Sequence, residues 1–361
     1  MDTDISHSHI NNRQYSERYK YIDYAKALLI LLVVLGHSGF PFTSFIYLFH
    51  MAAFFMISGF LYKSDDGNLF YNVIKRIRTL YLPFIMYNFI FLVLYNKFID
   101  LRIYNSSATK YNLGDLFYRV IDIMTFGSYG ENLLGAFWYI VVLFEVTIIY
   151  ALINAISLKS RRREYITLFL VMLIYALGII SLLYGIHLPR NLNTATFVLP
   201  LFYLGNTFAK YEDKVPMKRI VFIGSLILLI IMNRIGKINI GQNIYTNQFF
   251  YLVSSISGFY MVIYISKVLA SKFDMAVVGY IGRNTFVILA YHFLSFKLAS
   301  VLYIYLNSYD ITRLSEFPIL SPEEPYGWVL YTIIGLLVPL VLKWIYEKVK
   351  IRIARLLTLK E

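Results

Sequence analysis

Long apolar stretches alternate with short polar ones along the whole chain. Most are close to the roughly 20 residues that an α-helix needs to cross ~30 Å of hydrocarbon. The pattern predicts ten transmembrane helices, at residues 21–39, 44–62, 80–96, 136–157, 165–185, 196–209, 219–235, 248–266, 284–306 and 327–346. The sixth is short for a complete crossing, so we expect it to be tilted, broken or extended into its neighbours.

The composition points to the same fold class. The chain is 58% hydrophobic and 15% charged, whereas about a quarter of the residues in a soluble domain are charged. We therefore predict an all-α, polytopic membrane bundle with the lipid bilayer as its solvent. Its parts are a cytoplasmic tail at 1–20, a transmembrane domain at 21–346 and a basic cytoplasmic tail at 347–361. No signal-peptide cleavage pattern follows the first tail, so the first helix is expected to stay as an anchor.

The distribution of charge indicates an orientation. The chain has 34 basic and 21 acidic residues, a net charge of +13. If the N-terminus is cytoplasmic, 24 Lys and Arg residues fall in cytoplasmic segments, eight in outer connections and two inside helices. Such a bias is typical of cytoplasmic loops. The sequence thus predicts both termini in the cytoplasm, and it explains the positive charge without a nucleic-acid partner. In the long outer connection 97–135, the amphipathic stretch 113–124 is expected to lie at the membrane interface.

Ionisable residues inside the apolar stretches are the candidate functional groups, because each costs ~2.5–3.5 kcal/mol near the bilayer centre. In the first helix, Lys26 and His37 are 11 residues apart, which is three turns plus about 20° and ~16 Å along the axis. They share one face, with a cation near the cytoplasm and a titratable base deeper in the membrane. The alternative is that Lys26 reaches the headgroups and His37 bonds a neighbouring helix.

Four further ionisable residues accompany them. His50 in the second helix has a depth similar to that of His37, so the two rings are candidates to meet. Glu145 and His292 lie in the middle of the fourth and ninth helices, and Arg283 stands at the entrance of the ninth. The chain has no cysteine, which excludes a cysteine acyl-enzyme and thiolate metal ligands. We expect no metal.

Five stretches occur in the order found in a known family. IDYAKALLILLVVLGH has a basic residue, then ten residues, then a histidine. It is followed by FHMAAFFMISGF, KRIRTLYLP, FWYIVVLF and IGRNTFVILAYH. Over essentially the whole chain this resembles the acyltransferase-3 superfamily, and within it the fucose 4-O-acetylase-like branch. The usual pattern has Arg where this chain has Lys26; lysine keeps the charge but loses the bidentate fork.

The resemblance implies an integral membrane O-acetyltransferase. It would move an acetyl group from cytosolic acetyl-CoA, a co-substrate, to a hydroxyl of a cell-surface polysaccharide or its lipid-linked precursor. His37 would be the catalytic residue, as general base or as transient acyl acceptor, together with Lys26. Under this mechanism we expect supporting roles for the other ionisable residues: His50, Glu145 and His292 for orientation or proton relay, and Arg76, Arg78 and Arg283 for the acyl-CoA phosphates.

Two other functions fit the same intramembrane charges. A glycan or lipid transporter or flippase would use them as a relay, although such proteins often show internal repeats and matched helix breaks, which this sequence lacks. A non-catalytic relative would keep the fold for assembly. The acceptor sugar and the oligomeric state stay open.

Overall fold

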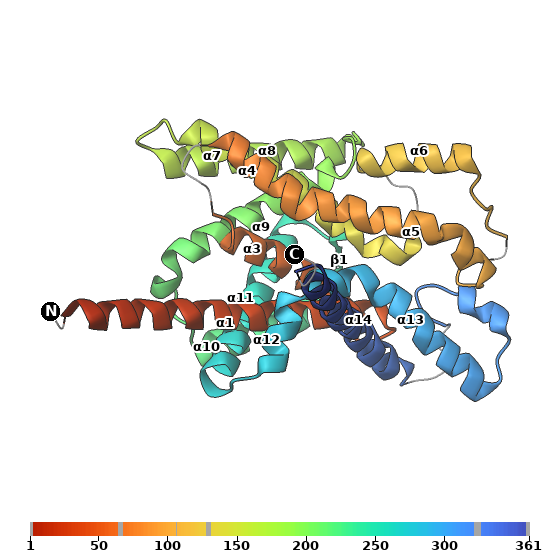
Figure 1. Ribbon diagram of the computed structural model, residues 1–361. Coiled ribbons are helices and arrows are strands. Elements are labelled where there is room, and N and C mark those ends of the chain that lie inside the picture. Colours follow the sequence, from red (N-terminus) through yellow and green to blue (C-terminus); the bar gives the residue numbers. More distant parts are fainter. Residues whose placement is uncertain (1–2, 64–67, 106, 128–130, 321–325, 359–361) are drawn as a thin grey trace.

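The computed structural model describes residues 3–63, 68–105, 107–127, 131–320 and 326–358, and within these ranges the side chains of residues 20–352. This part of the chain is mostly helical, and a single two-stranded hairpin interrupts the helices (Figure 1). Helix α1 runs lengthwise through the molecule, with helices to both sides of it (Figure 1).

The first part of the chain forms seven α-helices, a π-helical turn (η1) and a 3₁₀ turn (η2). Their bounds are α1 Thr3–His37, α2 Thr43–Tyr47, α3 His50–Phe60, α4 Leu69–Arg76, η1 Ile77–Tyr81, α5 Leu82–Asp100, α6 Leu113–Met124, η2 Asn132–Phe137 and α7 Trp138–Ser157.

The second part adds seven α-helices, three 3₁₀ turns and the hairpin. Their bounds are α8 Arg163–Leu183, α9 Leu192–Tyr211, η3 Glu212–Lys214, α10 Arg219–Ile235, β1 Ile238–Asn239, η4 Ile240–Gln242, β2 Ile244–Tyr245, α11 Gln248–Lys272, α12 Ala276–Arg283, α13 Thr285–Asn307, η5 Ile311–Ser315 and α14 Gly327–Thr358.

Within the described residues, seven helical segments are long and apolar enough to cross a membrane. The chain is therefore a multi-pass membrane protein, and seven of the ten predicted spans overlap these segments. The segments are Thr43–Phe60, Leu69–Asp100, Asn132–Ser157, Arg163–Leu183, Gln248–Lys272, Thr285–Asn307 and Gly327–Arg352. The other three predicted spans fall on α1, α9 and α10, which are helical but do not meet the same criterion.

Each of these three helices falls short for a visible reason. Helix α10 has only 17 residues. In α1, the part whose side chains are described, residues 20–37, contains three charged residues, Lys20, Asp23 and Lys26. Helix α9 mixes Asn and Thr with its apolar residues and contains Pro200. Every residue from 194 to 202 of α9 is buried, so protein rather than lipid surrounds this helix. That is why the short sixth stretch lacks the apolar surface of a lipid-facing helix.

Several predicted boundaries differ from the structure. The second predicted span is divided into α2 and α3, and the third is only the middle of a longer segment that begins at Leu69 and includes η1. The proposed tail boundaries at 20/21 and 346/347 lie inside α1 and α14. The amphipathic stretch at 113–124 is a helix, α6, with Asn112 and Asp115 forming a reciprocal cap at its start.

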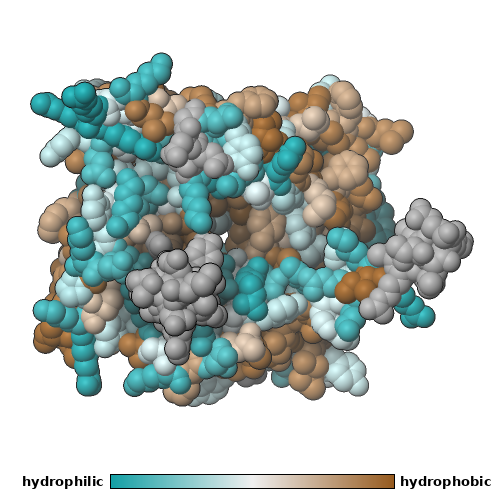
Figure 2. All heavy atoms as spheres, turned by 60° about the vertical axis from the view of Figure 1, so that its left-hand side comes forward, coloured by the Kyte–Doolittle hydropathy of each residue, from teal (hydrophilic) through white to brown (hydrophobic). Residues whose placement is uncertain are grey.

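The helices separate into inner and lipid-facing ones. The most apolar part of the α2–α3 segment is 72% buried and that of η2–α7 is 67% buried. The corresponding parts of α4–α5, α8 and α14 are only 22–28% buried, although their mean hydropathies of 1.7–2.7 are as a group no lower than the 1.5 and 2.2 of the two buried segments. Exposed apolar surface on this scale needs lipid to cover it. Figure 2 shows hydrophilic side chains gathered near the start of α1 and hydrophobic ones along the flank of the molecule.

Helices α3 and α9 touch backbone to backbone in the interior. A Cβ atom added to Gly59 of α3 would lie 1.9 Å from the carbonyl oxygen of Phe202, and one added to Gly205 of α9 would lie 1.8 Å from that of Met56. Only glycine permits this approach, which is a common way for membrane helices to pack. The contact fixes α3, and with it His50 at the first position of that helix.

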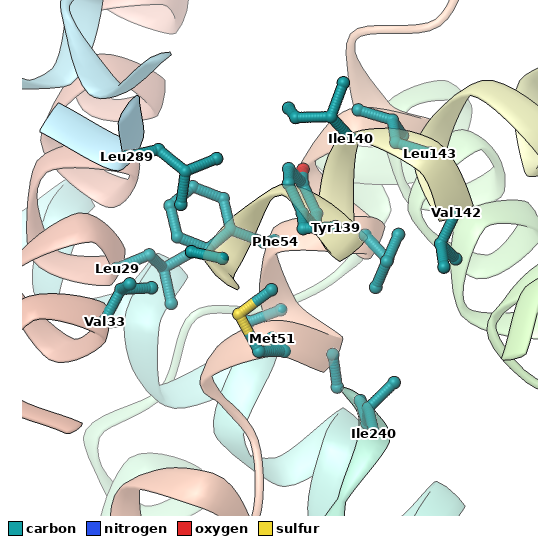
Figure 3. Close-up of a cluster of buried hydrophobic side chains, with 14 of the residues drawn as sticks. Leu29, Val33, Met51, Phe54, Tyr139, Ile140, Val142, Leu143, Ile240 and Leu289 are labelled. Carbon is teal, nitrogen blue, oxygen red and sulfur yellow. The ribbon is translucent and has the colours of Figure 1, made fainter. Parts of the chain in front are cut away.

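The central core joins segments that are far apart in the sequence. Its side chains come from α1, α3, α7, η4 and α13, as Figure 3 shows. The labelled members are Leu29, Val33, Met51, Phe54, Tyr139, Ile140, Val142, Leu143, Ile240 and Leu289. The same five elements, together with α2, η2 and β1, supply the walls of the cavity described next.

Candidate active site

His37 is the last residue of α1. The helix stops there because Ser38 and Gly39 turn the chain, with Gly39 at a φ of +84°. The Ser38 hydroxyl donates to the carbonyl of Leu35 and accepts a hydrogen bond of 3.2 Å from the Thr332 hydroxyl of α14. The end of α1, and therefore the His37 ring, is thus held against a second helix.

His292 of α13 lies against His37. The ring centroids are 5.6 Å apart with an angle of 29° between the planes, and Phe293 contacts both rings at 4.8 and 4.1 Å. His292 is fully buried. Its Nδ1 atom lies 3.1 and 3.0 Å from the carbonyl oxygens of Ile288 and Leu289. A carbonyl only accepts, so in the neutral ring Nδ1 carries the proton and Nε2 is the acceptor. That Nε2 has no hydrogen-bond partner among the described residues.

His50 has the same arrangement at the start of α3. Its Nδ1 lies 2.9 Å from the carbonyl oxygen of Ile46, and the Tyr47 ring stacks on it with centroids 5.1 Å apart. The Tyr47 hydroxyl donates to the carbonyl of Gly36, one residue before His37. The bond to Ile46 again leaves Nε2 as the acceptor of the neutral ring.

His37 and His50 border one cavity of about 310 Å³. With a share of roughly 30 Å³ per water molecule, it is large enough for several waters or a small polar ligand. The two histidines therefore share a cavity, whereas the described ring contacts of His37 are with His292 and Phe293. The lining residues are Val33, His37, Tyr47, His50, Met51, Gly135, Ala136, Trp138, Asn239, Ile240, Gly241, Gln242 and Leu289.

Lys26 and Arg283 meet at a different place, on the N-terminal side of His37 along α1. The Lys26 ammonium lies 2.7 Å from one carboxylate oxygen of Asp23, and the Arg283 guanidinium lies 3.4 Å from the other. Helix α12, which ends at Arg283, packs along α1. This charge cluster, Asp23, Lys26 and Arg283, is three helical turns from His37 along α1, or ~16 Å.

Arg76 and Arg78 lie on a separate element. The Arg76 guanidinium sits 4.8 Å from the centre of the Tyr62 ring, and its Nε atom is buried without a hydrogen-bond partner in the described part of the chain. Arg78 belongs to η1 and is exposed. Helix α4 and η1 pack on α7, and no interaction described for these two arginines reaches the charge cluster.

Glu145 does not line the cavity. It lies on α7, and its Oε1 accepts a hydrogen bond of 3.3 Å from the backbone N–H of Asn191, just before α9. Its Oε2 is buried with no partner among the described groups. Glu145 thus faces the α8–α9 connection, and the structure joins it to none of the three histidines.

The sequence did not identify Lys297 of α13 as a site residue, because a lysine in a membrane helix is expected to extend its side chain toward the membrane surface. It is only 3% exposed. Its ammonium donates to the backbone carbonyls of Leu314 at 2.9 Å and Glu316 at 2.6 Å. The next residue, Phe317, packs on Phe293 with centroids 4.9 Å apart. Lys297 therefore fastens the α13–α14 connection beside the histidine pair.

Tyr47, Trp138, Asn239 and Gln242 were also missed. Tyr47 could have been found from its position three residues before His50, and Trp138 from its place in the stretch FWYIVVLF. Asn239 and Gln242 carry no signal in the sequence, since their segment is distant from His37. Within the described residues, no group of three or more His, Asp or Glu side chains is placed to hold a metal ion.

Comparison with known proteins identifies the family. The model of the acyltransferase-3 family, described as an acyltransferase domain, matches residues 19–347. The match includes all the residues of the histidine cavity and of the charge cluster. No curated protein and no solved structure matches the chain.

Proposed function

The chain belongs to the acyltransferase-3 family, and from that premise we propose that it is an O-acetyltransferase of the cytoplasmic membrane. It transfers the acetyl group of cytosolic acetyl-CoA to a hydroxyl of a cell-surface polysaccharide, such as an exopolysaccharide, or of its lipid-linked precursor. Lys26 in the basic position favours the fucose 4-O-acetylase-like branch. Both termini lie in the cytoplasm, so the start of α1 faces the donor.

The observation that carries the proposal is the histidine cavity at the end of α1. An acyl transfer to an alcohol needs a base at the hydroxyl and room for donor and acceptor together. The cavity holds His37 and His50, and its volume suits a polar ligand. The charge cluster on the same helix supports a donor whose phosphates stay at the other end.

We assign the proton transfer to His37. Its imidazole takes the proton of the acceptor hydroxyl while the hydroxyl oxygen attacks the thioester carbonyl. The carbon–sulfur bond then breaks, and the coenzyme A thiolate leaves and takes the proton back from His37. In the second route, the His37 imidazole attacks the thioester carbonyl, the carbon–sulfur bond breaks and the coenzyme A thiolate leaves. The acceptor hydroxyl oxygen then takes the acetyl group from His37, and its proton passes to the thiolate.

His292 and His50 support His37 in this scheme. Both have Nδ1 engaged with backbone carbonyls, which fixes the tautomer and leaves Nε2 as a proton acceptor. The buried, unpaired Nε2 of His292 stands beside the His37 ring. We propose that it relays the proton or stabilises the imidazolium that forms on His37. Glu145 has no part in this scheme, because it faces the α8–α9 connection.

The charge cluster is the proposed phosphate site of the donor. Arg283 is 59% exposed, so its guanidinium is accessible to a ligand, and guanidinium groups bind phosphate through paired hydrogen bonds. Lys26 adds a second cation on the face of α1 that leads to His37. The pantetheine arm would follow that face for the ~16 Å between them. Arg76 and Arg78 would contact the more distant phosphate or nucleotide end.

The test uses purified protein with radiolabelled acetyl-CoA and the surface glycan of the producing cells. His37→Ala is expected to reduce acetyl transfer at least a hundredfold and to remove acetyl groups from the glycan, measured as mass differences of one acetyl group. His187→Ala, which changes an exposed histidine between α8 and α9, is the matched control. Full glycan acetylation in His37→Ala cells with normal protein levels would refute the proposal.

A further inference from the structure

The connection between α10 and α11 is a hairpin that enters the site. Strands β1 and β2 pair antiparallel, Ile238 with Tyr245 and Asn239 with Ile244, and η4 forms the tip. Non-helical backbone in a membrane protein is found where protein buries it or where it lines a water-filled cavity. Here the hairpin meets the second condition, because four consecutive residues, 239–242, line the histidine cavity.

The hairpin is fastened on the side away from the cavity. Ile238, which does not line the cavity, is buried. Asn243 is in the left-handed conformation with a φ of +54°, and its Oδ1 accepts a hydrogen bond of 2.9 Å from Thr194 of α9. The Tyr245 ring stacks on Phe197 of α9 with centroids 4.8 Å apart and planes nearly parallel. The tip is therefore held in place before any ligand arrives.

The tip presses against Trp138 at the start of α7. A Cβ atom added to Gly241 would lie 2.9 Å from the indole ring, so the glycine allows the backbone to rest on the tryptophan. Trp138 and the tip thus form one continuous wall. The cavity shared with His37 and His50 lies beside it.

Two amide side chains stand on this wall. The Asn239 Nδ2 donates to the Gln242 Oε1 at 2.9 Å. Each amide has one donor and one acceptor group, so this bond leaves the Oδ1 of Asn239 as an acceptor and the Nε2 of Gln242 as a donor. Two neighbouring sugar hydroxyls offer the complementary pair, one donating and one accepting.

The charges distinguish the acceptor from the donor. The lining of the cavity contains no lysine or arginine among the described residues, which disfavours phosphate. Cations instead gather three turns away, at the charge cluster. An uncharged ligand rich in hydroxyl groups fits the wall, and an aromatic face such as Trp138 suits the apolar face of a sugar ring.

We propose that Asn239 and Gln242 are the acceptor-binding residues: they hold two neighbouring hydroxyls of the carbohydrate and so determine which hydroxyl faces His37. This inference rests on the proposed acetyl transfer. It adds the residues that recognise the acceptor and separates them from the residues that bind acetyl-CoA.

The experiment compares variants in the cells that make the protein. Acetate is released from the surface glycan by mild base, and binding of radiolabelled acetyl-CoA is measured on purified protein. Asn239→Ala with Gln242→Ala is expected to lower glycan acetate about tenfold, from two lost hydrogen bonds, and to leave acetyl-CoA affinity within twofold. Gln242→Ala alone, a change at an exposed residue, should lower glycan acetate severalfold. Asn307→Ala, an exposed amide at the end of α13, is the control and should change neither.

The exchange variant, Asn239→Gln with Gln242→Asn, keeps both amides but moves them. It should retain more acetate than the double alanine variant and alter its distribution among hydroxyls, read by NMR of the glycan. Unchanged glycan acetate in the alanine variants, or a loss of acetyl-CoA affinity equal to the loss of acetate, would overturn the inference. If wild-type and His37→Ala glycans carry the same acetate, the proposed function itself fails.

Discussion

The two ends of the α1 segment from Asp23 to His37 carry their ionisable groups in opposite surroundings. At the start, Lys26 and Arg283 flank a single carboxylate, Asp23, and the guanidinium is more than half exposed. At the end, His37 lies between aromatic rings, and its neighbour His292 is completely buried. In the first arrangement Arg283 can exchange Asp23 for another anion, because an ion pair of an exposed side chain is weak. The second holds rings and tautomers in place.

This difference suggests a division of labour along one helix. Accessible cations suit the binding and release of a charged co-substrate, whereas fixed, enclosed histidines suit proton transfer with defined geometry. The helix between them carries an unbroken apolar run, residues 27–35. Changes at His37 and the residues packed around it should therefore lower kcat. Changes in the charge cluster should raise the KM for acetyl-CoA.

The largest effect is expected from His292→Phe. Phenylalanine keeps a ring against His37 but removes the Nε2 acceptor, so kcat should fall about a hundredfold with little change in the KM for acetyl-CoA. The pH profile of kcat should also change, because a proton acceptor is lost. Steady-state kinetics of purified protein across pH would show this. A rise in the KM for acetyl-CoA as large as the fall in kcat would contradict the proposed separation between donor binding at the charge cluster and proton transfer at His37.

Lys297→Met should produce the next largest change. The methionine fills the space of the lysine stem but leaves the carbonyls of Leu314 and Glu316 without their donor, a cost of about 1–3 kcal/mol for an unsatisfied buried group. Loosening this connection should shift Phe317 on Phe293 and lower kcat about tenfold. Thermal unfolding in detergent and kinetics measure the two effects. Wild-type kcat with lowered stability would mean that the fastening serves folding alone.

Lys26→Ala sharpens the other side of the comparison. Removing one charge-assisted contact to phosphate should raise the KM for acetyl-CoA about tenfold, while kcat changes less. Lys26→Arg keeps the charge and should remain close to wild type. The two variants are compared in acetyl-CoA titrations. A selective fall in kcat in Lys26→Ala would place the lysine in the chemical step instead.

The smallest effect on turnover is expected at Glu131, just before the span that contains α7. Burial raises the pKa of this carboxyl to about 7, and the group accepts from the Tyr104 hydroxyl and from the Leu133 N–H at the start of η2. An acid with a raised pKa in the folded state loses stabilisation as pH rises from its unfolded value near 4.5 to about 7.

Glu131→Gln should remove that dependence. Wild-type unfolding temperature is expected to decline by a few degrees over this pH interval, and the variant should be nearly flat. Kinetics at pH 7 should be almost unchanged, because Glu131 holds η2 and does not line the cavity. If the unfolding temperatures of wild type and Glu131→Gln decline equally with pH, another group causes the pH dependence of stability.

Periodicity and hydropathy predicted most of the helices. Ten predicted spans all fall on helices, because an apolar segment in lipid must satisfy its own backbone hydrogen bonds. The same reasoning failed for helices that are surrounded by protein and not by lipid. Helix α9 lies in the interior and includes polar residues. The second predicted span is divided at residues 48–49 into α2 and α3. Segment lengths alone do not reveal which helices are enclosed.

For the site, spacing along a single helix was informative and contact between helices was not. The face shared by Lys26 and His37 follows from helix geometry. The stacking of His292 on His37, the link from Arg283 through Asp23 to Lys26, and the orientation of Glu145 toward Asn191 depend on how distant segments pack. Lys297 is the clearest example, since its partners are backbone carbonyls, which leave no trace in residue identity.

The sequence by itself determined that this is a multi-pass helical membrane protein of the acyltransferase-3 family, with Lys26 and His37 on one face of its first helix. These conclusions need only composition, local periodicity and motif order. Tertiary structure alone decided which side chains surround His37 and that a hairpin from between α10 and α11 closes the cavity with Asn239 and Gln242. The reason is physical: a local pattern specifies a helix and its apolar face, but close packing of many helices selects which faces meet.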